Sequence, residues 1–316
     1  MERFAVADVH LAAVHPSDHG AESGLVVDVE GTEQMGSKEK FWCTRRGTQE
    51  RYLLKYARAD TGEDWAEKIA AELAGDGGLR LPHARVELAT FRGRSAVLVR
   101  DFLGEGERLI HGNELLFERD PNYRREMRRV RQHTLTNVFD VLDLRAVGIP
   151  SGLDLPDGVA TAADLYSGYL VLDALIGNTD RHHENWGIVL KREAGGERVL
   201  TLAPTYDHGS SLGRELRDEE RHRRMKTADT RSSLRAYAER ARSAFFGTEE
   251  APNPLGTFDL LQLAAQRCGA AVRAWIDRLE AAKRDLPYHL LVDRVPPERM
   301  SIEAREFTPL LLNDRP

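Results

Sequence analysis

Short β-prone runs separated by glycine-containing turns dominate the first hundred residues. Residues 41–44 and 51–57 flank one such turn and predict a β-hairpin. Residues 85–89 and 95–102 flank another and predict a second hairpin, in which an apolar run ends abruptly in polar residues. The pattern therefore predicts a small antiparallel sheet in this part of the chain.

A helical pattern lies between the two hairpins. Residues 64–74 place Trp65, Ile69 and Leu73 at helical spacing, with charged residues on the other side. This periodicity predicts one amphipathic helix that packs against the sheet.

Helical patterns dominate beyond residue 105. Residues 134–147 and 160–175 predict two core helices, and residues 255–312 predict two or three more, with breaks at prolines. Residues 214–233 are strongly polar, which fits either a segment that shapes a substrate site or a mobile surface loop. No internal repeat interrupts this order.

Composition and charge narrow the class of protein. The 316 residues are 41% hydrophobic, enough for a sizeable core, and a formal net charge of -6 gives no electrostatic reason to expect nucleic acid or an anionic membrane as a partner. Two cysteines, Cys43 and Cys268, fit a reducing compartment, and no run of residues approaches a membrane span in length. We expect a cytoplasmic protein.

Arginines are concentrated in residues 122–131. A cluster of this kind could bind an acidic substrate, but a charge run is usually the solvated face of a helix, and we favour that interpretation. The cluster consists of Arg124, Arg125, Arg128, Arg129 and Arg131.

The densest chemistry lies in a predicted strand–turn–strand segment. Asp180 and Asn185 are five residues apart, and the predicted hairpin of residues 186–190 and 199–203 folds Asp207 back beside Asn185. Phosphoryl transfer needs such a set: one carboxylate for the hydroxyl proton, and an amide oxygen with a second carboxylate for Mg²⁺. The segment therefore predicts a phosphotransfer site.

The order of these residues has known relatives. Protein kinases place an Asn five residues after the base Asp and a metal-binding Asp in a later Asp-x-Gly triplet, here Asp207-His208-Gly209. Two motifs carry a closer resemblance: residues 177–185 are Gly-Asn-Thr-Asp-Arg-His-x-x-Asn, and residues 202–207 are Leu-Ala-Pro-x-Tyr-Asp. Together they resemble the HipA-like serine/threonine kinases of bacteria. This branch also resembles the phosphoinositide kinases.

The resemblance implies an α+β, bilobal protein kinase-like fold. Residues 1–33 would be a loosely ordered lead-in, and residues 34–103 an N-lobe with a small antiparallel β-sheet and one helix. Residues 104–316 would form a larger, mainly helical C-lobe. ATP and Mg²⁺ are the implied cofactors.

It also implies roles for individual residues. Asp180 would be the catalytic base, Asn185 and Asp207 the magnesium ligands, and Lys55 the contact to the nucleotide phosphates. A glutamate of the helix at residues 64–74 pairs with this lysine in the family; Glu67 is our first candidate and Glu72 the second.

The remaining candidates surround the nucleotide. The turn Gly36-Ser37-Lys38 would cover the phosphates, and Ser37 occupies the place of a serine that the family can autophosphorylate. By position, the backbone of the linker at Val99, Asp101 and Phe102 would bind adenine. His182 is expected to support the loop beside the nucleotide by hydrogen bonding, and not to act as the base.

Three functions compete at this point. The first is a protein serine/threonine kinase, which we favour. The second keeps the fold but transfers phosphate to a small molecule or a lipid. The third is a catalytically inactive nucleotide-binding scaffold, which the joint presence of Lys55, Asp180, Asn185 and Asp207 disfavours.

Overall fold

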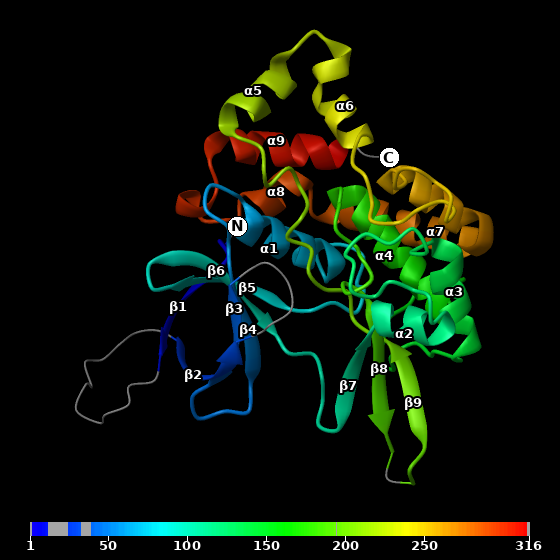
Figure 1. The fold of residues 1–316 in the computed structure, drawn as a ribbon. Helices are drawn as coiled ribbons and strands as arrows, with labels where there is room; N and C mark the ends of the chain where they lie inside the picture. Colours follow the sequence, from blue (N-terminus) through cyan, green and yellow to red (C-terminus); the bar gives the residue numbers. More distant parts are fainter. Residues whose placement is uncertain (1, 12–24, 33–38, 194, 315–316) are drawn as a thin grey trace.

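A six-stranded barrel forms the N-terminal part of the protein (Figure 1). The computed structural model describes residues 2–11, 25–32, 39–193 and 195–314, so the turn Gly36-Ser37-Lys38 lies outside the described residues. The strand order is β1-β2-β3-β4-β6-β5, and β5 pairs with β1 to close the barrel. The strands are β1 (Val6–Leu11), β2 (Leu25–Thr32), β3 (Lys40–Arg45), β4 (Arg51–Tyr56), β5 (Val86–Phe91) and β6 (Arg94–Arg100).

Both predicted hairpins are present, as β3–β4 and β5–β6, but two expectations for this region are wrong. Residues 6–11 and 25–32 were expected to be a loosely ordered lead-in and instead form β1 and β2. The sheet is also not purely antiparallel, because β1 runs parallel to both β2 and β5. Parallel pairs need long connections and leave no local hairpin signal, which explains why the sequence pattern missed them.

The helix α1 (Glu63–Ala74) packs against β5 and β6. The three apolar residues that predicted it, Trp65, Ile69 and Leu73, are all buried. The inside of the barrel has its own apolar cluster, which includes Val27, Leu54 and Leu98. Helix and barrel together hold β4 rigidly beside the larger part of the protein.

Helices and a second small sheet make up the C-terminal part. The predicted hairpin is confirmed as β8 (Gly187–Arg192) and β9 (Arg198–Leu202), and β7 (Glu107–His111), which was not predicted, adds a third strand beside β8. The helices are α2 (Gly112–Arg119), α3 (Leu135–Leu144), α4 (Ala162–Ile176), α5 (Asp218–Lys226), α6 (Leu234–Glu239), α7 (Thr257–Asp285), α8 (Tyr288–Val292) and α9 (Ile302–Asn313), with short 3₁₀ turns at Thr230–Ser232 and Pro297–Arg299.

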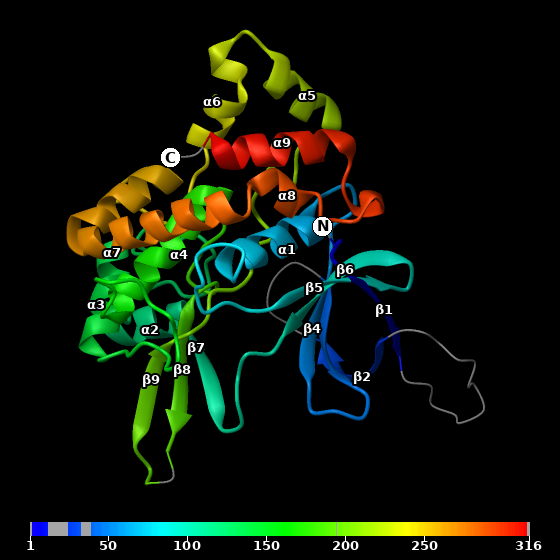
Figure 2. The same cartoon turned by 180° about the vertical axis from the view of Figure 1, so that it is seen from behind.

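The central helix α4 is buried along most of its length and packs on α7 (Figure 2). Its start is fixed by the Thr161 hydroxyl, which accepts a hydrogen bond from the Asp164 N–H at 3.1 Å. It ends at Gly177, whose φ of 63° is a left-handed conformation that glycine adopts without strain. The chain therefore leaves α4 at a defined angle, and residues 178–185 lie on the side that faces the barrel.

The polar segment after residue 213 is more regular than the sequence suggested. It forms α5 and α6, which lie beside α9 at the top of Figure 1. Arg221 of α5 is buried and donates to the Gly213 carbonyl at 3.1 Å. The alternative of a mobile surface loop is thus wrong for residues 218–226.

Two expectations about compartment can be compared with the structure. Cys43 and Cys268 are buried free thiols. None of the helices in the described ranges is long and apolar enough to cross a membrane.

Candidate active site

A cleft of about 380 Å³ lies between the barrel and the helical part. Lys55, Asp180, Asn185 and Asp207, which are far apart in the sequence, all line it. The barrel supplies one wall, and the segments before β8 and after β9 supply the opposite one. The four residues on which the sequence prediction depended are therefore brought together around one space.

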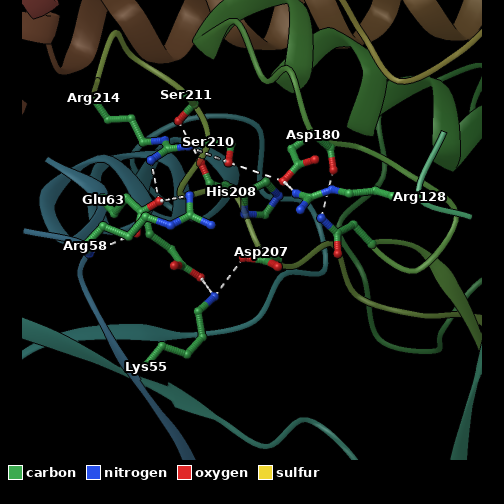
Figure 3. A network of polar contacts seen from close by, with 12 residues as sticks. Lys55, Arg58, Glu63, Arg128, Asp180, Asp207, His208, Ser210, Ser211 and Arg214 are labelled. Atoms are coloured by element: carbon green, nitrogen blue, oxygen red, sulfur yellow. Dashed lines mark hydrogen bonds and ion pairs between the residues drawn. The ribbon is translucent and has the colours of Figure 1, made fainter. Parts of the chain in front are cut away.

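Lys55 connects the two walls of the cleft. Its Nζ lies 2.5 Å from Glu67 Oε1 on α1 and 2.8 Å from Asp207 Oδ1 (Figure 3). Burial alone would lower the pKa of Lys55, but the Asp207 and Glu67 carboxylates outweigh it and hold that pKa above its ordinary value. Lys55 is therefore a fixed cation at all physiological pH values.

The choice between Glu67 and Glu72 follows from the orientation of α1. Glu67 is 2% exposed and faces β4, whereas Glu72 accepts an ion pair from Lys68 at 2.6 Å on another side of the helix. The two glutamates are five residues apart, and that spacing puts them on different faces of a helix. Only Glu67 contacts Lys55.

Asp207 sits in a constrained turn. Its φ of 58° is unusual for a residue other than glycine, and such strain is found most often at functional sites. The next glycine, Gly209, lies against α1: a Cβ there would come within 3.1 Å of Glu67 Oε2. A side chain at the third residue of the Asp-x-Gly triplet would therefore press on the glutamate that holds Lys55.

A buried polar network shapes the loop that carries Asp180. Asp173 of α4 accepts from Arg181 at 2.6 and 2.7 Å and from Asn178 Nδ2 at 2.9 Å. Arg181 also donates to the Asn185 carbonyl at 3.0 Å, and Asn178 Oδ1 accepts from the Asp180 N–H at 2.9 Å. Both ends of the loop are thereby attached to α4, which fixes where Asp180 and Asn185 point.

Asn185 and Asp207 suit a magnesium ion. Asn185 donates its amide N–H to the Asp180 carbonyl at 2.8 Å, which leaves its oxygen as the atom that a cation would use. No group of three or more His, Cys, Asp or Glu that could hold a metal occurs within the described ranges. A site with two protein oxygen ligands fits Mg²⁺, which commonly takes its other ligands from water and nucleotide phosphates.

His182 lines the cleft, and its Nδ1 accepts a hydrogen bond from the Glu184 N–H at 3.2 Å. Burial lowers the pKa of His182, an effect that the nearby Asp180 partly opposes. The supporting role of His182 in this loop stays a prediction.

The end of β6, which includes Val99, and the linker after it form the far end of the cleft. Val99, Asp101 and Phe102 all line it, and the Phe102 ring stacks on Tyr206 at a centroid distance of 5.8 Å. The Asp101 N–H donates to the Arg51 carbonyl at 2.9 Å, so this group of the linker is already engaged. Contact between the linker backbone and adenine stays a prediction.

Several lining residues were missed by sequence reasoning: Trp42, Leu53, Leu109, Tyr206 and Arg128. Strand alternation contained the signal for two of them, because Leu53 shares the face of Lys55, and Trp42 pairs with Leu53 across the hairpin. Tyr206 stands directly before Asp207 in a motif already recognised. No sequence signal separated Arg128 from its neighbouring arginines.

Arg128 departs from the expected solvated role of its cluster. Its guanidinium donates to Asp180 Oδ2, and the Ser210 hydroxyl donates to the same oxygen at 3.3 Å (Figure 3). Arg124, Arg125 and Arg131 are exposed and outside the cleft, as expected. Residues 120–134 form no helix, so the expected helix face is wrong for the whole cluster, and Arg128 in addition contacts Asp180.

Fold and site together are those of the protein kinase-like class: a barrel with a lysine–glutamate pair above a loop carrying Asp and Asn. The model of the family described as HipA-like C-terminal domain matches residues 29–283, and the chain belongs to that family. None of the curated proteins compared with the chain matches it.

One solved structure supports the fold, and a second is a weaker match. The proinflammatory kinase CtkA of Helicobacter pylori superposes with a TM-score of 0.68 at 20% identity, over 92% of both chains. The PknI kinase domain of Mycobacterium tuberculosis is a more distant match, with a TM-score of 0.33 at 16% identity over 91% of this chain and 95% of that one.

Proposed function

We propose that this protein is an ATP- and Mg²⁺-dependent phosphotransferase that acts on serine or threonine hydroxyls of proteins. The observation that carries the proposal is the convergence of Lys55, Asp180, Asn185 and Asp207 on one cleft, with Lys55 held between Glu67 and Asp207. A scaffold that only senses nucleotides has no need of all four.

Each residue has a distinct task. Lys55 holds the nucleotide phosphates, and Glu67 keeps its ammonium group aimed at them. Asn185 and Asp207 would hold Mg²⁺, which supplies positive charge to the phosphate oxygens. Asp180 orients the acceptor hydroxyl and accepts its proton, while the new oxygen–phosphorus bond forms and the bond to the β-phosphate oxygen breaks.

The active-site carboxylates provide the direct test. Asp180→Asn and Asp207→Asn should each lower phosphotransfer by on the order of 100-fold or more, because charge and geometry dominate this transition state. Transfer from labelled ATP to proteins, inositol lipids and metabolites measures the effect and separates protein from small-molecule acceptors. Asp154→Asn, an exposed carboxylate outside the cleft, is the matched control.

Two outcomes would contradict the proposal. Full phosphotransfer by both purified variants would remove Asp180 and Asp207 from the mechanism. Transfer confined to lipids or metabolites would replace the protein acceptor. Autophosphorylation of Ser37 stays a prediction from the family resemblance, and mass spectrometry of the protein after incubation with ATP tests it.

A further inference from the structure

A second hollow, of about 320 Å³, adjoins the nucleotide cleft and shares Arg58, Arg128, Asp180 and His182 with it. We name it the arginine hollow. Its lining contains four guanidinium groups and one carboxylate. The lining residues are Arg58, Arg128, Arg129, Thr179, Asp180, His182, Ser210, Arg214 and Ala244.

Two of the four arginines, Arg58 and Arg214, are held in place by one buried carboxylate. Glu63, 2% exposed, lies beneath the hollow and accepts from Arg58 at 3.1 Å and from Arg214 (Figure 3). Arg129 makes no ion pair with any residue in the described ranges. Four guanidinium groups thus face two carboxylates, Asp180 and Glu63, in a chain whose formal net charge is -6. This local excess of positive charge indicates a site for an anion.

A chain of hydrogen bonds joins the hollow to the candidate base. Arg214 Nη2 donates to Ser210 Oγ at 3.3 Å, and Ser210 donates to Asp180 Oδ2 at 3.3 Å. Arg128 donates to that same oxygen from the opposite side. Any group that binds the arginines therefore lies within reach of Asp180 and competes with it for Arg128.

The hollow also lies where an acceptor must approach. A nucleotide in the cleft would lie between Lys55 and Asp180, so the acceptor hydroxyl has to reach Asp180 from the other side. The rim is open to solvent, since the side chains of Arg58 and Arg128 are 42% and 53% exposed. An open rim suits an extended polypeptide better than an enclosed metabolite.

Building on the proposed function, we propose that the arginine hollow is the acceptor subsite, and that it selects serines or threonines flanked by acidic side chains. Guanidinium groups bind carboxylates through paired, charge-assisted hydrogen bonds. A carboxylate of the acceptor draws Arg128 away from Asp180, which leaves the Asp180 oxygen able to take the hydroxyl proton. The acidic residue of the acceptor thus binds the arginines and also frees Asp180 to act as the base.

The experiment uses two peptides that differ only in charge, one with glutamates on both sides of a single serine and one with glutamines there. Fluorescence anisotropy measures their binding to the full chain without nucleotide, and labelled ATP measures kcat/KM. We expect the acidic peptide to bind about 10-fold more tightly and to lose this advantage at high salt.

Arg129→Glu should bring the affinities for the glutamate-flanked and the glutamine-flanked peptide close to each other. Arg131→Glu is the matched control, because Arg131 belongs to the same segment but does not line the hollow, and it should keep the preference. Melting temperatures of both variants confirm that they are folded. Inorganic phosphate, added as a competitor of the peptides, tests whether a small anion binds to the same arginines.

The outcomes separate this inference from the function on which it rests. Equal binding of the two peptides, or equal loss of preference in both variants, would overturn the arginine hollow even if phosphotransfer is efficient. Competition by phosphate without any peptide preference would overturn the peptide acceptor. Selective binding that depends on Arg129 supports the subsite, and it does so even in a preparation that transfers no phosphate, where only the proposed function would fail.

Discussion

Two buried ion pairs lie within the same site. One is on the barrel side of the cleft and the other is on the helical side, and they differ in what surrounds them. The Lys55–Glu67 pair shares its cation with Asp207, whose side chain is 37% exposed at the cleft. The Asp173–Arg181 pair is enclosed, with side chains 5% and 1% exposed, and its remaining hydrogen bonds go to Asn178 and Asn185. The first pair thus presents charge to a ligand, while the second positions backbone.

Burial affects both cations in the same direction. It would lower the pKa of Arg181 as it would that of Lys55, and in each case the paired carboxylate raises the pKa above its ordinary value. The charge alone therefore does not distinguish a structural pair from a functional one. The distinguishing feature is whether one partner still faces a space that a ligand can enter.

Breaking the enclosed pair should have the largest effect. Asp173→Ala leaves the Arg181 guanidinium buried without its partner, and removal of one member of a buried pair costs about 3–5 kcal/mol. Urea unfolding measures this loss. Asp154→Ala, which removes a 64% exposed carboxylate from its pair with Arg80, should cost at most about 1 kcal/mol. Equal costs for the two variants would abolish the distinction between enclosed and open pairs.

Replacing the open pair tests the other half of the comparison. Lys55→Met combined with Glu67→Leu removes both buried charges together, so the free energy of unfolding should stay within about 1 kcal/mol of the starting value or rise. Phosphotransfer should nevertheless fall by on the order of 100-fold, because the cation for the phosphates is gone. A large loss of stability with retained transfer would show that Lys55 serves the fold instead.

Acid should lower the stability of the helical part through two buried histidines. Burial lowers the pKa of His183 to about 4 and that of His133 to about 3, against about 6.5 in an unfolded chain. The unfolded state binds more protons between these values, so stability is complete above about pH 6.5 and falls as the pH drops toward 4.

Melting temperatures recorded from pH 8 to pH 4 measure this effect, and we expect a decrease of about 5 °C or more. Fluorescence of Trp186, whose indole N–H donates to His133 Nε2 at 3.1 Å, follows the same region. His183→Asn should flatten the decrease, whereas His222→Asn, at an exposed position, should not. A melting temperature that is constant from pH 6.5 to 4 would contradict the assignment.

Much of the fold was predictable because its signals are local. The two N-terminal hairpins, α1, α4 and the β8–β9 hairpin follow from alternation, helical spacing and turn residues within short windows. β1, β2 and β7 were not predicted, and two of them depend on a partner far along the chain: β1 on β5, and β7 on β8. Pairing at that range leaves no trace in a short window.

The candidate site divides in the same way. Asp180 and Asn185 were identifiable because five residues of chain fix their separation, and Asp207 because a short hairpin returns it to them. The partner of Lys55 stayed open between Glu67 and Glu72, and the rotation of α1 against the barrel decided it.

By itself, then, the sequence determined the strand and helix pattern and the spacing of the loop that carries the chemistry, since both depend on neighbours along the chain. Only the tertiary structure decided that the barrel closes through a parallel strand, that Glu67 holds Lys55, and that Arg128 contacts Asp180. These contacts join segments whose distance is set by how whole elements pack. Packing depends on the complete set of buried surfaces, which no short stretch of sequence contains.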